Sequence, residues 1–573
     1  MDIRRGWAAA CAAIVLCGGL GACGGGGGGS PGTPKPPPVT PPPVASYPDI
    51  PASDADAARF LAQATFGPTR AEIARLRQIG YRRWLDEQLD PARTPPTLVL
   101  PHLQQVVANG VPRDDLRQQH RRNAWLWQAA TAPDQLRMRM AFALSEIFVV
   151  SDREVANANT TLYRIADYQD TLARGAFGSY RTLIEQVTLH PAMGYFLSHA
   201  GNRKADPAAN ITPDENYGRE VMQLFSIGLS KRNPDFTLQL DAAGKAIPTY
   251  DEQVVGAMAR VFTGWTYAGQ ADAQFGRRND TSYAPMECHP RYHDDQPKRI
   301  FDGIVVDAGS DCVASLKQAL DALAAHRNVA PFISRQLIQR FVTSNPSNAY
   351  VGRVAATWTA TSGNLGQVLR TLLLDDEARI RPQGDGFGKA REPLVRLTTL
   401  WRAFDARYVP PATGEIRFRF ANAGDLTESL AQDSLRAPSV FNFFDPDYRL
   451  PTEAGSQGLY APEFQILTEA TYVGMLNQHD AMAWNYVGAP PTANTAAPVL
   501  DMSALVALAE AGNHAGMVDQ VDTLLFDGRL GQPAEQAMVR MLDRLAAINE
   551  TASNRAKSLV LLALASPEFA IQR

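Results

Sequence analysis

Apolar side chains recur every three or four positions along most of the chain, which is the spacing of amphipathic helices. Ser53 precedes one such stretch and predicts a helix over about 54–65. Capping boxes, in which a hydroxyl and a carboxylate three residues later bind free amides of the first turn, begin at Thr69, Thr212 and Thr249. The pattern therefore predicts a mainly helical protein.

Residues 123–150 are apolar on all sides rather than on one stripe. This density predicts one long helix that is buried on most sides. Met138 and Met140 lie within it. A methionine copper site is one interpretation of this pair, but packing in the core is the one that the apolar context favours.

A second helical block follows in the middle of the chain. Ile333, Leu337 and Phe341 repeat every four residues, and two more periodic stretches cover 351–358 and 365–372. Short loops between them predict antiparallel neighbours. A final helix is expected from Asn554 to about Ala565.

Strand signals are few. Residues 237–248 alternate around Gly244 and predict a short hairpin, and 266–312 are polar and irregular, with short strands near 300–306. The predicted fold class is therefore mainly α: a large multi-helix domain over 51–573 with a short β-hairpin and irregular polar loops. It forms either one body or two lobes divided near 380.

The first residues are typical of an export signal. Arg4 and Arg5 precede an apolar core that is too short to span a bilayer and ends at Cys23 in a lipobox-like sequence. We expect residues 1–22 to be a lipoprotein signal peptide and Cys23 to carry lipid. Residues 23–50 then form a tether, since 24–48 contain seven Gly and nine Pro.

The net charge and the cysteine content indicate which partners and which cellular compartment to expect. A net charge of -4 argues against nucleic acid as a partner. After cleavage and lipidation only Cys288 and Cys312 remain, and a disulfide is the simplest state of such a pair outside the cytoplasm. Two zinc ligands are the weaker alternative, because the sequence has no CxxC motif.

The strongest polar cluster contains Asp214, Glu215, Arg219 and Glu220. Capping and an i,i+4 ion pair between Glu215 and Arg219 account for these residues. As a functional alternative, Glu215 or Glu220 serves as an acid–base or metal carboxylate and Arg219 orients it. His190 is a further catalytic candidate, although its place before Pro191 near a helix start favours a buried, hydrogen-bonded histidine.

A second cluster is a candidate site for a divalent metal. His293 and Asp294 offer an imidazole and a carboxylate within a polar loop, although no HExxH motif is present. Trp265 is expected in the core. Arg335 and Arg340 are expected on the polar side of their helix, where they pair with carboxylates or bind phosphate or sulfate.

Eight motifs, taken as a set, resemble the bacterial family called domain of unknown function 1800. They start at Ala58, Leu189, Pro213, Phe262, His293, Phe332, Pro438 and Ser566, and the match runs from about 56 to 570. Gly218 stands where that pattern carries Ala. The resemblance implies a large exported protein without an established reaction. It also implies a neighbour or partner that resembles exported phosphatases and sulfatases.

Two functions stay open at this point. The first is an accessory or scaffold lipoprotein of the cell envelope, anchored by lipid at the outer membrane and working with the hydrolase-like partner. The second is a metal-assisted or acid–base hydrolase that acts on a polymer or an anionic ester. Its site would gather His190, Glu215, Arg219, Glu220, His293 and Asp294.

Overall fold

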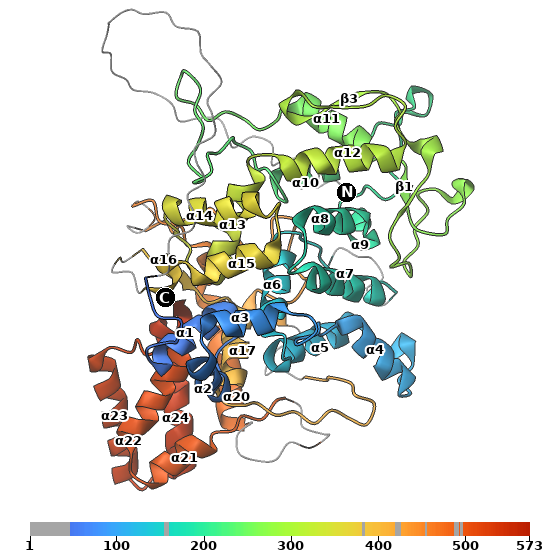
Figure 1. Ribbon diagram of the computed structural model, residues 1–573. Coiled ribbons are helices and arrows are strands. Elements are labelled where there is room, and N and C mark those ends of the chain that lie inside the picture. The colour runs from blue at the N-terminus through green and yellow to red at the C-terminus, as the bar shows by residue number, and fades with distance from the viewer. Residues whose placement is uncertain are drawn as a thin grey trace, which may run out of the picture. The chain divides into compact units, whose positions relative to one another are not determined.

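The computed structural model describes residues 46–573 apart from 154–159, 381–383, 385, 419–425, 453, 454, 456, 486–491 and 493–496. The expected signal peptide, Cys23 and most of the expected tether lie outside the described residues. Residues from 43 onward form one compact unit. Its elements are mostly helical, which confirms the predicted fold class (Figure 1).

The helices in chain order are α1 (Asp54–Ala64), α2 (Arg70–Ile79), α3 (Tyr81–Leu89), α4 (Val99–Ala108), α5 (Gln118–Thr131), α6 (Gln135–Ser145), α7 (Leu162–Gly175), α8 (Tyr180–Leu189), α9 (Pro191–Phe196), α10 (Asn216–Gln223), α11 (Glu252–Val261), α12 (Cys312–Ala325), α13 (Val329–Phe341), α14 (Asn348–Ala360), α15 (Leu365–Leu374) and α16 (Asp376–Arg379). They continue with α17 (Pro393–Ala403), α18 (Leu426–Leu430), α20 (Glu469–Asn485), α21 (Ser503–Glu510), α22 (His514–Val521), α23 (Gln532–Ala547), α24 (Ala552–Ala565) and α25 (Pro567–Ala570).

The strands are short and pair in antiparallel twos. These pairs are β1 (Trp265–Thr266) with β2 (Glu287–Cys288), β3 (Lys298–Arg299) with β4 (Val305–Val306), and β5 (Lys389–Ala390) with β6 (Ile571–Gln572). The predicted hairpin is present, with Leu240 opposite Ala246. The strands expected near 300–306 are confirmed as well.

Two of the predicted helix starts are confirmed. Ser53 accepts a hydrogen bond from the amide of Asp56 at the start of α1, and Thr69 accepts one from the amide of Glu72 at the start of α2. These side chains satisfy amides that have no partner inside the helix.

The capping boxes predicted at Thr212 and Thr249 are wrong. α10 begins at Asn216, because Asn202 binds the amide of Asp214 and holds the preceding segment outside the helix. α11 is capped by Asp251, whose carboxylate accepts from Val254, while the Thr249 hydroxyl donates to the carbonyl of Gly228. In both cases a tertiary contact, which a local motif cannot reveal, replaces the predicted cap.

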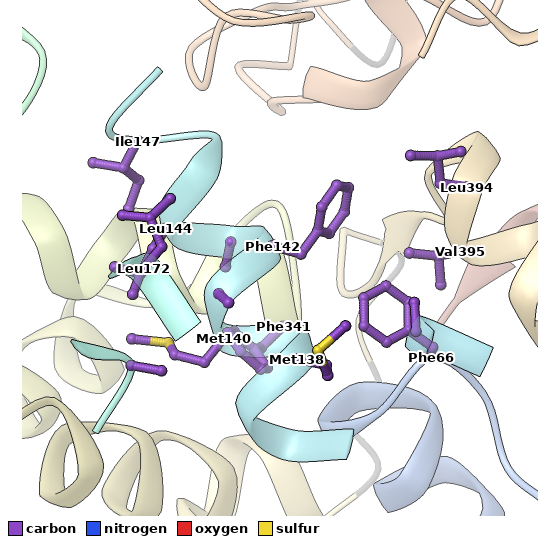
Figure 2. Packing of buried hydrophobic residues seen from close by; sticks show 14 of the residues in the cluster. Phe66, Met138, Met140, Phe142, Leu144, Ile147, Leu172, Phe341, Leu394 and Val395 are labelled. Atoms are coloured by element: carbon purple, nitrogen blue, oxygen red, sulfur yellow. The ribbon is translucent and has the colours of Figure 1, made fainter. Parts of the chain in front are cut away.

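The stretch 123–150 is two helices rather than the single long helix predicted. α5 ends at Thr131 and α6 starts at Gln135, with Pro133 between them. Proline lacks an amide hydrogen and disfavours helical backbone at the residue before it. Burial on most sides is confirmed for α6, whose Met138 and Met140 pack in the core shown in Figure 2.

The helices α13, α14 and α15 pack in sequence as predicted. Arg335 and Arg340 are buried, at only 6% and 3% exposed, and each pairs with a carboxylate, which is one of the two expected roles. α13 is covered on nearly every side, so its polar side chains point into the molecule. Trp265 is buried, as expected.

Segments far apart in sequence meet around α17. α17 packs against α5 and against the π-helical turn Asp522–Phe526, and α1 also contacts that turn (Figure 1). One cluster of buried apolar residues connects these elements. Among the described helices, none combines the length and the apolar composition that a membrane crossing needs.

Candidate functional site

His190 is a buried cap residue. It precedes α9, where its Nδ1 accepts from the amide of Ala192 at 3.1 Å, and its Nε2 lies 3.3 Å from an oxygen of Asp167. Burial lowers the pKa of His190, and the nearby Asp167 opposes part of that shift. A structural role as a buried, neutral, hydrogen-bonded histidine therefore explains His190, and no catalytic role is needed.

The Glu215 cluster is an ion-pair network at the surface. Arg219 binds Glu215 at 3.2 Å, which confirms the predicted i,i+4 pair, and it also binds Glu252 on α11 at 3.1 Å. Glu220 faces inward, and burial raises the pKa of its carboxyl. Arg219 therefore fastens α10 to α11, and Gly218 lies at the same contact, where an added Cβ would be 3.0 Å from the amide nitrogen of Ala259.

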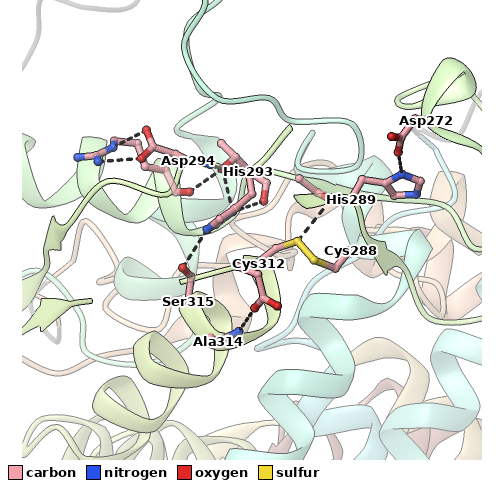
Figure 3. The surroundings of a disulfide bond; sticks show 12 residues. Asp272, Cys288, His289, His293, Asp294, Cys312, Ala314 and Ser315 are labelled. Atoms are coloured by element: carbon pink, nitrogen blue, oxygen red, sulfur yellow. Dashed lines mark hydrogen bonds and ion pairs between the residues drawn. A yellow bond between two sulfur atoms is a disulfide. The ribbon is translucent and has the colours of Figure 1, made fainter. Parts of the chain in front are cut away.

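The disulfide between Cys288 and Cys312 is present and closes the loop that carries His293 (Figure 3). His293 is buried, with Nδ1 2.8 Å from the carbonyl of Thr263 and Nε2 2.9 Å from the hydroxyl of Ser315. Burial lowers the pKa of His293. Both ring nitrogens thus already have protein partners.

Asp294 is paired with Arg260 through two hydrogen bonds of 2.8 and 2.9 Å. Burial would raise the pKa of Asp294, but the bonds from Arg260 outweigh it and hold the pKa below its usual value. Across the residues that the structure describes, no three His, Cys, Asp or Glu side chains are grouped as a metal would require. The metal site at His293 and Asp294 stays a prediction.

The structure brings only part of the predicted site together. Glu215 and Asp294 line one open cavity of about 1340 Å³, here called the outer cavity, whose walls come from α11 and the loops around 248 and 300. His190, Glu220 and His293 are not among its lining residues. Glu215 and Asp294 are therefore the two predicted residues that this cavity brings together.

A second cavity of about 630 Å³, here called the arginine pocket, lies between α13, the hairpin that starts at Gly228 and the segment 438–447. Arg335 enters it from α13. Its guanidinium carbon lies 4.7 Å from the ring centres of both Phe236 and Tyr460. Such cation–π contacts fix the direction of a long side chain.

Two guanidinium groups of the arginine pocket face one rim carboxylate. Asp447 lies 2.8 Å from Arg335, and its side chain is 55% exposed. The guanidinium carbon of Arg232 lies 3.9 Å from the ring centre of Phe236. Among the described residues, no carboxylate lies within ion-pair distance of Arg232, although Asp447 is near enough to oppose the lowering of its pKa by burial.

The inner wall of the pocket belongs to a buried charge network. Arg340 and Glu146 line the wall, with Nε of Arg340 3.4 Å from Oε2 of Glu146. Gln432 bridges two carboxyls, since its Nε2 donates to Glu146 at 3.3 Å and to Glu392 at 2.7 Å. Glu146 ends α6 and Glu392 precedes α17, so two helix ends meet here.

The two bridged carboxyls are close enough to hydrogen-bond to each other. Burial raises the pKa of Glu146 well above its usual range, and the neighbouring Glu392 raises it further. Burial acts on Glu392 in the same direction, but Lys389 and Arg139 outweigh it and lower the pKa of that carboxyl. Within this pair, the pKa of Glu146 is therefore raised and that of Glu392 is lowered.

The mouth of the pocket combines apolar and strained residues. Leu229 and Phe441 are 59% and 58% exposed. Asn442 follows with a positive φ of 69°, and neither polar atom of its buried side-chain amide has a hydrogen-bond partner within the described part of the chain. Strain and unpaired polar groups concentrate at functional sites.

Sequence reasoning found only fragments of this pocket. It named Arg335 and Arg340 as anion-binding candidates and noted the motif from Pro438 to Phe444. It missed Glu146 and Glu392, because each is a single glutamate in an apolar or helix-start context. The one available signal was that a charged glutamate is unusual in a segment whose apolar pattern predicts burial.

The chain matches the family model described as a protein of unknown function, DUF1800, over residues 59–571. No curated protein and no solved structure matches it. The matched region contains the outer cavity, the disulfide and the arginine pocket. Since the match covers nearly the whole chain, this protein belongs to the DUF1800 family.

Proposed function

We propose that this protein is a lipid-anchored accessory protein of the cell envelope that binds an anionic ligand in the arginine pocket. One observation carries the binding role: Arg232 and Arg335 share Asp447 as their nearby carboxylate, and among the described residues Arg232 has none at ion-pair distance. An anionic group on a ligand would supply the missing negative charge. Guanidinium groups suit this task because they bind carboxylate and phosphate oxygens through paired donors.

The ligand carries an apolar part as well. Leu229 and Phe441 are exposed at the pocket mouth, and Phe236 and Phe332 also line the cavity. Pockets for small molecules commonly combine apolar walls with a few placed polar groups. A carboxylate or phosphate attached to an alkyl chain fits both requirements.

The accessory role is inferred from the contacts made by the residues that the sequence analysis named as catalytic or metal-binding candidates. His190, Arg219, His293 and Asp294 all make contacts that fasten helices or loops to each other. The lipid anchor at Cys23, the outer-membrane location and the hydrolase-like partner belong to the same proposal. A metal-assisted hydrolase remains the alternative, and metal analysis of protein purified without chelators tests it.

Thermal unfolding with octanoate as the probe tests the binding role. Octanoate should raise the midpoint of wild type in a concentration-dependent way, because a ligand that binds only the folded state stabilises it. Octanol, which lacks the charge, should raise it less. Arg335→Ala should abolish the octanoate effect.

Arg260→Ala provides the matched control, since Arg260 is also ion-paired to an aspartate but lines the outer cavity. It should keep the full octanoate response. Equal responses of wild type and Arg335→Ala would contradict the binding role. For the accessory role, a tagged chain should recover a phosphatase- or sulfatase-like protein from solubilised envelopes, and its absence would count against that role.

A further inference from the structure

We propose that the arginine pocket faces a lipid bilayer and takes the phosphate of a membrane phospholipid at Arg232 and Arg335, while apolar residues beside its mouth enter the leaflet. This inference rests on the proposed function, because it narrows the anionic ligand with an alkyl part to a phospholipid. The apolar residues are Leu229, Leu238, Leu240 and Phe441, here called the apolar rim.

The apolar rim consists of large side chains that face solvent next to the pocket. Leu229 and Phe441 line the pocket itself. Leu238 and Leu240 are 42% and 55% exposed, and they lie two positions apart in an extended segment, so they project to the same side. Exposed apolar side chains that gather in one place indicate contact with a partner or a membrane.

The pairing of the hairpin places these leucines beside the pocket arginines. Leu238 lies opposite Arg232 in an antiparallel bridge. The ring centre of Phe236 lies 3.9 Å from the guanidinium carbon of Arg232 and 4.7 Å from that of Arg335. Exposed leucines and guanidinium groups are therefore neighbours, as are the acyl chains and the phosphate of a phospholipid.

The carboxylates of this face are held mainly by their own turns. Asp235 accepts from the hydroxyl of Thr237 at 2.6 Å, and Asp241 accepts from two amides of its turn at 2.9 Å. Asp445 accepts from the amide of Asp447 at 2.8 Å. Among the described carboxylates, Asp447 alone lies at ion-pair distance from either arginine of the proposed phosphate site.

A bilayer matches both halves of this surface. Guanidinium groups bind phosphate through paired donors, and apolar side chains enter the boundary of the acyl chains. The chain length also keeps a bilayer within reach. Residues 24–45 separate the expected lipid on Cys23 from Ser46, where the described chain begins, and they can span at most roughly 80 Å.

A dye at position 240 tests insertion into the leaflet. In the chain 24–573, Cys288 and Cys312 are joined to each other, so Leu240→Cys provides the free thiol for an environment-sensitive nitrobenzoxadiazole label. Vesicles of digalactosyldiacylglycerol with phosphatidylglycerol should raise the emission, and nitroxide groups on the acyl chains should quench it. Glycerol phosphate, which lacks acyl chains, should leave the emission unchanged.

Sedimentation with vesicles tests the phosphate site. Digalactosyldiacylglycerol has no phosphate, and adding phosphatidylglycerol should tighten binding at least about tenfold. Arg335→Ala should remove most of this gain. Arg449→Ala is the matched control, because the guanidinium carbon of Arg449 also lies 4.7 Å from the ring centre of Tyr460 but Arg449 does not line the pocket. It should keep the gain.

The apolar rim has its own variants. Leu238→Ser combined with Leu240→Ser should weaken binding to both kinds of vesicle at least about tenfold, because two apolar contacts are lost. Ile548→Ser combined with Leu562→Ser removes two exposed apolar side chains at the end of α23 and on α24, and should bind as wild type does. Thermal midpoints of all variants establish that they are folded.

The outcomes are distinct. If vesicles change neither emission nor sedimentation while octanoate still binds through Arg335, the inference fails and the proposed function stands. If Arg335→Ala keeps the phosphatidylglycerol gain, or Arg449→Ala loses it equally, the pocket does not hold the phosphate and the inference fails. If octanoate does not bind either, the proposed function fails as well. A dimer that the leucine variant dissociates, without vesicle binding, would assign the rim to a second copy of the chain and overturn the inference.

Discussion

Glu146 and Glu215 are the same residue type with opposite properties. Glu215 is half-exposed and pairs with Arg219, so its carboxylate stays in a hydrated ion pair. Glu146 is 3% exposed, and its nearest charged neighbours include another carboxyl. The buried environment, rather than the residue type, therefore raises the pKa of Glu146.

Glu146→Gln should change how stability depends on pH. The pKa of Glu146 is raised above its ordinary 4.5, so between 4.5 and the higher folded value the folded protein binds more protons than the unfolded one. Its contribution to stability is complete below 4.5 and is lost as pH rises through the folded pKa. Glutamine keeps the hydrogen bonds and does not titrate.

Urea unfolding between about pH 5 and about pH 8 checks this. Wild type should lose stability relative to Glu146→Gln as the pH rises. A difference that does not change over this range would show that Glu146 titrates normally.

At the scale of the element, local motifs predict helices better than they predict helix starts. Ser53 and Thr69 each accept a hydrogen bond from an amide in the first turn of the helix that follows. Thr249 instead gives its hydroxyl to Gly228, and Asp251 takes over the cap. A cap residue acts as predicted only when the rest of the fold leaves its side chain free.

Asp251→Ala should destabilise the protein by about 1 kcal/mol, the usual effect of removing an N-cap side chain. Thr212→Ala is the comparison, because its motif predicts a cap that the structure does not form. It should cost less than about half as much. Chemical unfolding measures both, and equal losses would mean that Thr212 stabilises the folded state by some other contact.

The loop that carries His293 depends on a covalent link. Cys288 and Cys312 join β2 to the start of α12 across 24 positions of sequence. The double variant Cys288→Ser with Cys312→Ser should lose about 3 kcal/mol, because the unfolded chain gains entropy without the link. Unfolding by urea measures the loss, and reduction of wild type should reproduce it.

At the scale of the whole molecule, the fold gathers distant segments around the arginine pocket. Glu146, Arg340, Glu392 and Gln432 come from four separate stretches of the chain. The β5–β6 pair brings the end of the chain beside Lys389 in the same region. A truncation after α24 should therefore disturb the pocket as well as the C-terminus.

Cys23→Ser should release the protein from membranes. The proposed anchor is lipid on Cys23, and several acyl chains hold a protein far more firmly than one. Fractionation of cells that express wild type and Cys23→Ser measures the change. Recovery of both forms in the membrane fraction would contradict the anchor.

The chain by itself determined most of the elements. Helical periodicity gave α13, α14 and α15, and the alternation around Gly244 gave the hairpin, because both depend on neighbours within a few residues. The cysteine pair was found by elimination. Motifs distributed along the chain were enough to indicate the family.

Tertiary structure alone decided the candidate site. Folding raises the pKa of Glu146 by burial, places Arg335 between two aromatic rings and gives His293 two protein partners. The physical reason is that pKa, pairing and access depend on groups that are remote in sequence. Local spacing specifies a helix, whereas a charged side chain acquires its role only from what surrounds it after folding.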